Sequence, residues 1–286
     1  MPIKDKVLSF YSELPFNIKE SFNYVEQNIN FYHPQLTQLC LKNKNIVDIG
    51  CGPGHLINAI NYKLNNIPFY LKTLGNIKCK GIDFNPTAII FGLQYSNKYK
   101  LGTDFCIKNV FDLQKDDFYP SKKTIMIMSN GALHHTKDCL KAIEVILKES
   151  IKSKEKVSFL IGLYHLHGRK PFLDHFRKLK LDNHKENFLK NEFHKLRGIT
   201  KDKLNDESWF QDQVNHPLET QHTLSEIYPL FADYNFNLIN TSLDKFNYGD
   251  ISEIIEAEKH QFEIGSKALE EGRYFPGYFT CLFEKS

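Results

Sequence analysis

The chain of 286 residues lacks a long apolar run, and its mean hydropathy is -0.42. No window approaches the ~18 to 20 uninterrupted apolar residues that a membrane span needs. The amino terminus carries charges throughout and has no apolar run or small-residue cleavage site of a signal peptide. The six cysteines are scattered without a C-x-x-C pair, so we expect buried free thiols. These absences predict a cytoplasmic protein with no membrane partner.

An excess of one charge sign is also missing from the chain as a whole. The formal net charge is +3, which is too small for a general nucleic-acid footprint. Residues 165–204 depart from this balance, with eleven Lys and Arg against five Asp and Glu. This basic region is either a solvated helical face or a surface that contacts an anionic substrate or RNA.

Short apolar segments alternate with helical patterns through the first half of the chain. Buried parallel strands have this composition because helices cover both faces of their sheet. The expected strands are 45–50, 79–84, 104–111, 124–130 and 156–164, and the expected helices between them are 54–65, 86–98 and 138–151. The alternation predicts a doubly wound α/β sheet with right-handed crossovers.

The alternation stops after residue 164. Residues 165–235 have helical and aromatic-rich patterns, and we expect an insertion packed over the carboxyl edge of the sheet. Residues 236–286 return to strand character around a charged helix at about 251–271. The expected organisation is therefore a helical lead-in (1–40), an α/β core (41–164), a helical insertion (165–235) and a carboxyl-terminal part that completes the sheet (236–286).

The stretch NIVDIGCGPGHL (45–56) places a glycine-rich turn between an expected strand and an expected helix. Gly50, Gly52 and Gly54 are spaced G-x-G-x-G, and His55 stands where the third glycine of a dinucleotide fingerprint would fall. The triphosphate-binding pattern G-x-x-x-x-G-K-[ST] is also absent. Asp48 precedes the loop by two positions, and its carboxylate would repel a pyrophosphate and favour a positively charged ligand.

The segment VDIGCGPG resembles the first motif of class I S-adenosylmethionine-dependent methyltransferases of the small-molecule type. That cofactor carries a sulfonium, an amino-acid end and an adenosine, with no phosphate, so an acid beside a glycine loop suits it. The resemblance has motif-level support over roughly residues 45–165. It implies S-adenosylmethionine as the cofactor, a mostly parallel seven-stranded sheet, and an amino-terminal lid that carries Tyr11. Packing of that segment in the core is the open alternative to the lid.

The resemblance also implies which residues hold the cofactor. Asp83 would accept both ribose hydroxyls, Phe84 would lie against adenine, and Asn109 would read the adenine edge. The other implied contacts are Tyr11, Asp48, Gly50, Cys51, Gly52, Gly54, Val110, Ser129 and Asn130. The 35 residues from Asp48 to Asp83 exceed the ~20 usual for such units, and we assign the extra length to a loop at 65–78. Asp83 as a turn residue and Asn109 as a strand-end hydrogen bonder remain open alternatives.

Methyl transfer is an in-line displacement, so the enzyme must hold the acceptor atom ~3 to 3.5 Å from the methyl group. A base is needed only when the acceptor must lose a proton. His134 and His135 follow the fourth expected strand, and we predict that they act as a base or position the acceptor; bonding to backbone at a helix entry is the alternative. The expected acceptor contacts are Tyr164, His165, Trp209 and His216, with Arg169 and Asp212 as further polar candidates of the insertion. A metal site is expected to be absent, because His165, His167, His216 and His222 match no standard zinc spacing.

Three classes of function follow from these observations. The first is methylation of a small molecule, with no nucleic-acid partner and with a homodimer left open. The second is methylation of RNA or protein through the basic region; the chain reads SNGALHH after the fourth strand, without the Asn/Asp-Pro-Pro-Tyr of many amino-group methyltransferases. The third is binding of the cofactor without chemistry, against which the intact glycine loop argues.

Overall fold

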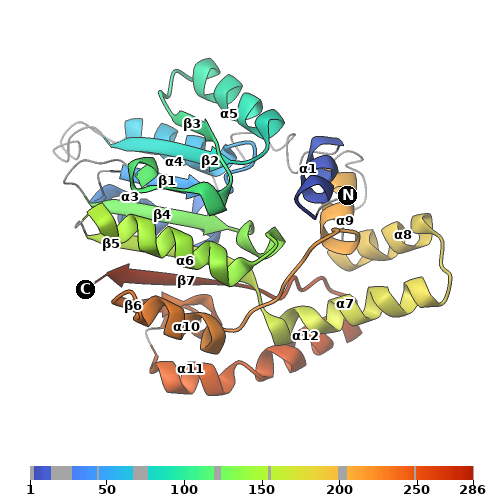
Figure 1. Ribbon diagram of the computed structural model, residues 1–286. Coiled ribbons are helices and arrows are strands. Elements are labelled where there is room, and N and C mark those ends of the chain that lie inside the picture. The colour runs from blue at the N-terminus through green and yellow to red at the C-terminus, as the bar shows by residue number, and fades with distance from the viewer. Residues whose placement is uncertain are drawn as a thin grey trace.

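The computed structural model describes residues 3–13, 28–43, 45–66, 77–118, 124–153, 156–198, 205–247 and 249–285. Its seven strands form one sheet in the order β3-β2-β1-β4-β5-β7-β6 (Figure 1). They are β1 (Asn45–Ile49), β2 (Lys78–Asp83), β3 (Asp104–Ile107), β4 (Ile125–Asn130), β5 (Val157–Tyr164), β6 (Phe236–Thr241) and β7 (Tyr278–Lys285). Neighbours among β1 to β5 pair in parallel, and β7 runs antiparallel to β5 and β6. The predicted doubly wound, mostly parallel sheet is confirmed.

Helices cover both faces of this sheet, which is why the central strands β1, β4 and β5 are buried along almost their whole length. The helices of the core are α3 (Leu36–Lys42), α4 (His55–Asn65), α5 (Pro86–Lys98), α6 (Cys139–Ser150) and α10 (Leu224–Ala232). Side chains alternate along a strand, so Ile46 packs with α3 and α4 while Val47 packs with α6 and α10. All six cysteines are free thiols, and all but Cys51 and Cys106 are buried.

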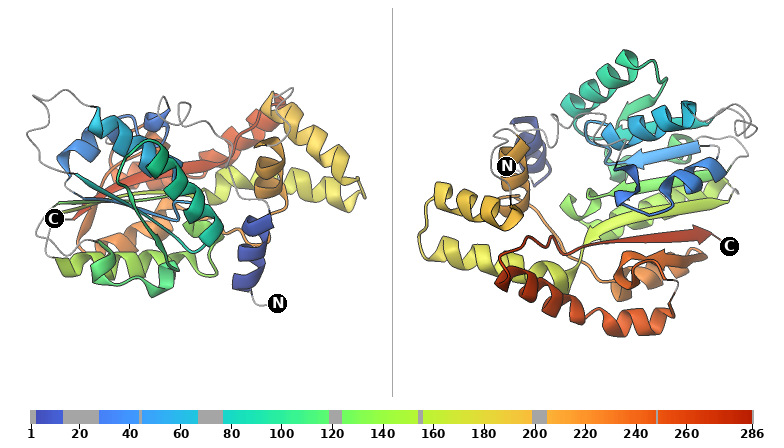
Figure 2. Two further views of the ribbon diagram at one scale, coloured as in Figure 1. Left: turned by 90° about the horizontal axis from the view of Figure 1, so that it is seen from above. Right: turned by 180° about the vertical axis from the view of Figure 1, so that it is seen from behind.

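The first three helices after β5 form a layer beyond the carboxyl ends of the parallel strands (Figure 1). They are α7 (Leu166–Leu181), α8 (Glu186–Arg197) and α9 (Asn205–Val214). They share a separate core that contains Phe172, Phe193 and Phe210. Figure 2 shows α1 (Ile3–Glu13) beside α9, at the same end of the sheet. No described helix is long and apolar enough to cross a membrane.

The structure corrects two expected boundaries. The third strand ends at Ile107, because Asn109 starts a 3-10 turn by accepting the Phe111 N–H at 3.1 Å. The expected helix at 251–271 is two helices, α11 (Ile251–Ala257) and α12 (His260–Glu270). Glu258 lies between them, and its buried carboxylate accepts backbone N–H groups at the start of α10. Residues 14–27 of the lead-in, 67–76 of the long loop and 199–204 of the basic region lie outside the described residues.

Candidate active site

A cavity of about 700 Å³ lies where the parallel strands end, and α1 and α9 contribute to its walls. Ligand sites of open α/β sheets form at this carboxyl edge. The predicted site residues that line it are Tyr11, Asp48, Gly50, Cys51, Gly52, Asp83, Phe84, Asn109, Val110, Asn130, His135, Tyr164 and Trp209. The predicted residues outside its lining are Gly54, Ser129, His134, His165 and His216.

The three glycines of the loop after β1 serve different purposes, although all have positive φ. A Cβ on Gly50 would lie 2.2 Å from the Ala132 Cβ, and one on Gly54 would lie 2.6 Å from the Phe105 ring. Packing therefore requires glycine at both positions. A Cβ on Gly52, at φ +52°, would meet no atom within 4 Å. Gly52 thus exposes its backbone to the cavity, where a ligand can approach it closely.

Two carboxylates flank this loop. Asp83 accepts the backbone N–H groups of Gly52 at 2.9 Å and Asn85 at 2.8 Å, so it ties the β1–α4 loop to the end of β2. Burial raises the pKa of Asp83, and the hydrogen bonds partly offset that rise. Burial, with the Asp83 charge as a smaller cause, raises the pKa of Asp48 to about 7. A cationic group of a ligand would remove the repulsion between the two acids.

We expect the raised pKa of Asp48 to make the ligand-free protein less stable as pH rises. The unfolded chain ionises this group near its ordinary value of 3.8, whereas the folded protein keeps the proton up to about pH 7. The free energy of unfolding therefore falls between these pH values, by at most ~4 kcal/mol. Asp48→Asn should raise the melting temperature at pH 8 and leave it nearly unchanged at pH 4. The exposed control Asp233→Asn should leave the melting temperature unchanged at both pH values. Equal shifts of the melting temperature in both variants at pH 8 would contradict the prediction.

Asn130, at the end of β4, presents an unpaired amide to the cavity. Neither its Oδ1 nor its Nδ2 has a hydrogen-bond partner among the described residues, although both atoms are buried. Such groups require a partner, so a polar ligand group is expected there. Ser129 points elsewhere, since its hydroxyl donates to the Ile49 carbonyl at 2.8 Å.

The two neighbouring histidines after β4 lie in different environments. Leu218 accepts the Nδ1–H of His135 at 3.0 Å, which fixes the tautomer and leaves a lone pair on Nε2. Burial lowers the pKa of His135 to about 4, so the ring is neutral at pH 7. His134 is fully buried, and neither ring nitrogen has a partner among the described residues. Its carbonyl accepts the Thr220 N–H at 2.9 Å, which ties the turn to the insertion.

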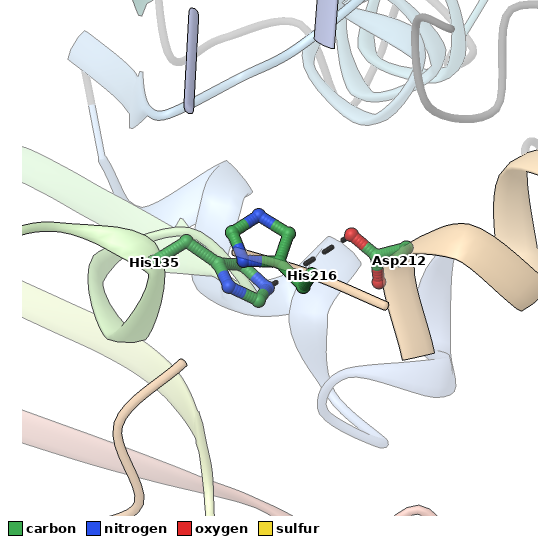
Figure 3. Close-up of side chains that lie close together, drawn as sticks. All are labelled: His135, Asp212 and His216. Atoms are coloured by element: carbon green, nitrogen blue, oxygen red, sulfur yellow. Dashed lines mark ion pairs between the residues drawn. The ribbon is translucent and has the colours of Figure 1, made fainter. Parts of the chain in front are cut away.

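Segments from three parts of the chain meet beside His135. The Tyr11 hydroxyl donates to Asp212 Oδ1 at 2.8 Å, and His135 Nε2 lies 3.9 Å from the same oxygen (Figure 3). The His216 ring lies against His135 with centroids 3.8 Å apart. His135, Asp212 and His216 each offer a ligand atom within 4.8 Å of the others. This cluster shares only His216 with the histidines that the spacing analysis considered for a metal.

A family model described as a methyltransferase domain matches residues 41–213. The chain belongs to this family. Together with the sheet order, the match makes it a class I methyltransferase that uses S-adenosylmethionine. A search of curated proteins finds no match.

Solved structures with the same fold differ widely in sequence from this methyltransferase. PKMT2 from Rickettsia typhi in complex with AdoHcy is 16% identical with a TM-score of 0.55; the match covers 85% of this chain and 49% of that chain. The magnesium protoporphyrin IX methyltransferase ChlM from Synechocystis PCC 6803 with bound SAM is 11% identical, with a TM-score of 0.51. The match covers 100% of this chain and 98% of that chain. The plantazolicin methyltransferase BamL, in complex with a triazolic desmethylPZN analog and SAH, is 13% identical, with a TM-score of 0.51. The match covers 99% of this chain and 95% of that chain. At these identities the matches show a shared fold. This chain spans about half the length of the Rickettsia protein.

Two polar residues at the start of the methyltransferase's insertion hold structure together. The His165 ring pairs with the buried Glu258 at 3.0 Å, away from the cavity. Arg169 is fully buried and stacks on the Tyr164 ring, with its guanidinium carbon 4.1 Å from the ring centroid. Its guanidinium N–H groups donate hydrogen bonds to oxygens of Glu219 and Gln213. Arg169 therefore positions Tyr164 and is not available to bind a substrate anion.

The site also contains residues that were not among the predicted contacts. Asp212 and Gln213 line the cavity from α9, and Tyr274 and Tyr278 line it from the carboxyl-terminal part. Asp212 was expected only as one of several further polar candidates of the insertion. Tyr274 and Tyr278 belong to the aromatic run RYFPGYF (273–279), for which packing is the simpler interpretation from sequence, so no local pattern marks them as site residues.

Proposed function

We propose that this methyltransferase acts on a small-molecule acceptor, which it encloses together with the cofactor in one cavity. The observation that carries the proposal is the continuity of the lining from Gly52 in the cofactor loop to His135 and Trp209 at the insertion. A cavity of about 700 Å³ is within the range of small-molecule sites.

The residues at the sheet edge fit S-adenosylmethionine. Gly52 leaves open space for the ligand, Asn130 offers an unpaired amide, and Asp48 and Asp83 place two carboxyl groups beside them, which a cationic group of the ligand would keep ionised. In this proposal Asp48 supports the amino-acid end, Asp83 accepts from the ribose and Phe84 lies against adenine. When bound, the cofactor supplies an electrophilic methyl group with a good leaving group.

The acceptor half of the cavity is formed by His135, Tyr164, Trp209 and Asp212. We assign His135 to the acceptor, because its Nε2 lone pair can take a proton or orient an N–H or O–H group. His134 lies outside the lining, and in this proposal it packs the turn that carries His135. The aromatic rings hold the acceptor in line with the methyl group and exclude water.

The described part of the basic region gives little support to an RNA or protein substrate. Arg169 is buried, and Lys170 pairs with Asp174 at 2.8 Å. Lys190 also forms an ion pair with Glu207. Each pair reduces the positive potential that would attract a phosphate backbone.

Calorimetric titration of the purified protein with S-adenosylmethionine, S-adenosylhomocysteine and NADH tests the cofactor assignment. We expect micromolar binding of both sulfur ligands and no binding of NADH, because the loop lacks the dinucleotide spacing. Binding of NADH without binding of either sulfur ligand would overturn the proposed function.

A further inference from the structure

Two hydrogen-bond acceptors converge on one point of the acceptor half of the cavity. The His135 Nε2 carries a lone pair, because its Nδ1–H is held by the Leu218 carbonyl. Asp212 Oδ1 lies 3.9 Å away and accepts one bond, from the Tyr11 hydroxyl, which leaves its second lone pair. Burial raises the pKa of Asp212. With its carboxyl group ionised, neither atom can donate to the other, so one ligand group that bonds to both must supply two hydrogens.

The Asp212 carboxylate also has no fixed cation beside it. Its side chain is only 4% exposed, and no Lys or Arg of the described residues lies within 4.0 Å of it. Arg169 is occupied by Glu219 and Gln213. The two histidines beside Asp212 are neutral at pH 7, because burial lowers the pKa of His135 to about 4 and that of His216 to about 3. A buried carboxylate in these surroundings favours a positively charged ligand.

We propose that the methyl acceptor is the nitrogen of a primary amine, an inference that rests on the proposed function. A donor nitrogen lies ~2.9 Å from its acceptor, so one nitrogen can reach both His135 Nε2 and Asp212 Oδ1 across their gap. A hydroxyl or thiol has one hydrogen and would leave one of the two acceptors facing a lone pair. A neutral primary amine satisfies both acceptors and retains the lone pair that attacks the methyl group.

The reaction balances with groups already present. The amine enters as R–NH₃⁺ beside Asp212 and gives one proton to His135 Nε2. Its lone pair then forms the N–CH₃ bond as the S–CH₃ bond breaks, and the sulfur keeps the bonding pair as a thioether. His135 releases its proton to water, and the product leaves as R–NH₂⁺–CH₃. Asp212 stabilises the positive charge on the nitrogen when the amine enters and again as the N–CH₃ bond forms.

A metal ion is the competing occupant, and the geometry favours it less. Ligand atoms lie ~2.0 to 2.2 Å from zinc, so the 3.9 Å gap corresponds to an angle of roughly 125 to 155° at the metal, wider than the tetrahedral angle that zinc prefers. His216 accepts the Leu218 N–H on Nδ1 at 3.1 Å, and its Nε2 therefore carries the proton. His216 thus has no free lone pair for a third metal bond.

Four probes of matched shape test the proposal: benzylamine, benzyl alcohol, benzyl mercaptan and benzoate. Each is titrated into protein loaded with S-adenosylhomocysteine, and N-methylbenzylamine is sought by mass spectrometry after incubation with S-adenosylmethionine. We expect benzylamine to bind at least ~10-fold more tightly than the alcohol, and Asp212→Asn to abolish this preference. Asp212→Asn should keep its affinity for S-adenosylhomocysteine. The exposed control Asp174→Asn on α7 should keep both this affinity and the preference for benzylamine.

Equal or tighter binding of the alcohol, methyl transfer to the alcohol or thiol alone, or no binding of any probe would overturn the amine assignment. Micromolar binding of zinc chloride that Asp212→Asn removes would overturn it too, by assigning the carboxylate to a metal. Failure of the wild-type protein to bind S-adenosylhomocysteine would instead refute the proposed function on which the inference rests.

Discussion

Replacing Gly52 with valine is expected to weaken binding of S-adenosylhomocysteine by at least ~100-fold, equivalent to ~2.7 kcal/mol. A Cβ at this position meets no protein atom within 4 Å, so the added side chain enters the cavity itself. It would displace the ligand without disturbing the packing beneath the loop. Calorimetry on the variant measures the effect directly.

Gly102 provides the matched control for backbone strain. The φ angle of Gly102 is +69° and that of Gly52 is +52°, so both have the left-handed conformation. A Cβ on Gly102 also meets no atom within 4 Å. It lies outside the cavity lining, between α5 and β3. Gly102→Val should lose a similar ~1–2 kcal/mol of stability from the left-handed conformation, with its cofactor affinity intact. Equal affinities of the two variants would mean that the loop does not cradle the cofactor.

Asp83→Ala is expected to reduce the affinity for S-adenosylhomocysteine by roughly 100-fold or more. The carboxylate accepts two backbone N–H groups, and hydrogen bonds to a charged group each contribute ~1.5–3 kcal/mol. Removing it frees the Gly52 end of the loop and, in our proposal, also removes the ribose acceptor. Titration calorimetry and thermal denaturation of the same sample separate these effects.

Asp104, exposed at the start of the neighbouring strand β3, is the control for loss of a carboxylate. Asp104→Ala should bind the cofactor like the wild-type protein. If Asp83→Ala kept wild-type affinity as well, the assignment of the sheet edge as the cofactor site would be wrong.

The fold was predictable because its signals are local. The mostly apolar run NIVDI predicts that both faces of β1 are buried, and the G-x-G-x-G spacing predicts that a tight turn follows. Strand ends were less accurate: Asn109 ends β3 early by bonding the Phe111 N–H, which competes with strand geometry. The break at Glu258 depends on the start of α10, over thirty residues earlier in the chain, and no local pattern reveals it.

The roles of the histidines at the site also depend on contacts that local sequence patterns do not reveal. His134 and His135 are adjacent and chemically identical in sequence, and only the orientation of the 3-10 turn decides that His135 lines the cavity. His165 follows β5 directly, yet its ring is held by Glu258, which lies between α11 and α12 in the carboxyl-terminal part of the chain. Candidate residues beyond strand ends are thus predictable as a group, while individual roles depend on distant partners.

The sequence by itself determined the sheet, the glycine loop and the acids that follow β1 and β2, because periodicity and turn chemistry act over a few neighbouring residues. The tertiary structure alone decided the acceptor half of the cavity. Tyr11 and Asp212 are 201 positions apart, and their hydrogen bond forms because α1 and α9 pack together beyond the sheet. No local pattern encodes a contact between distant segments, since it depends on the packing of the whole chain.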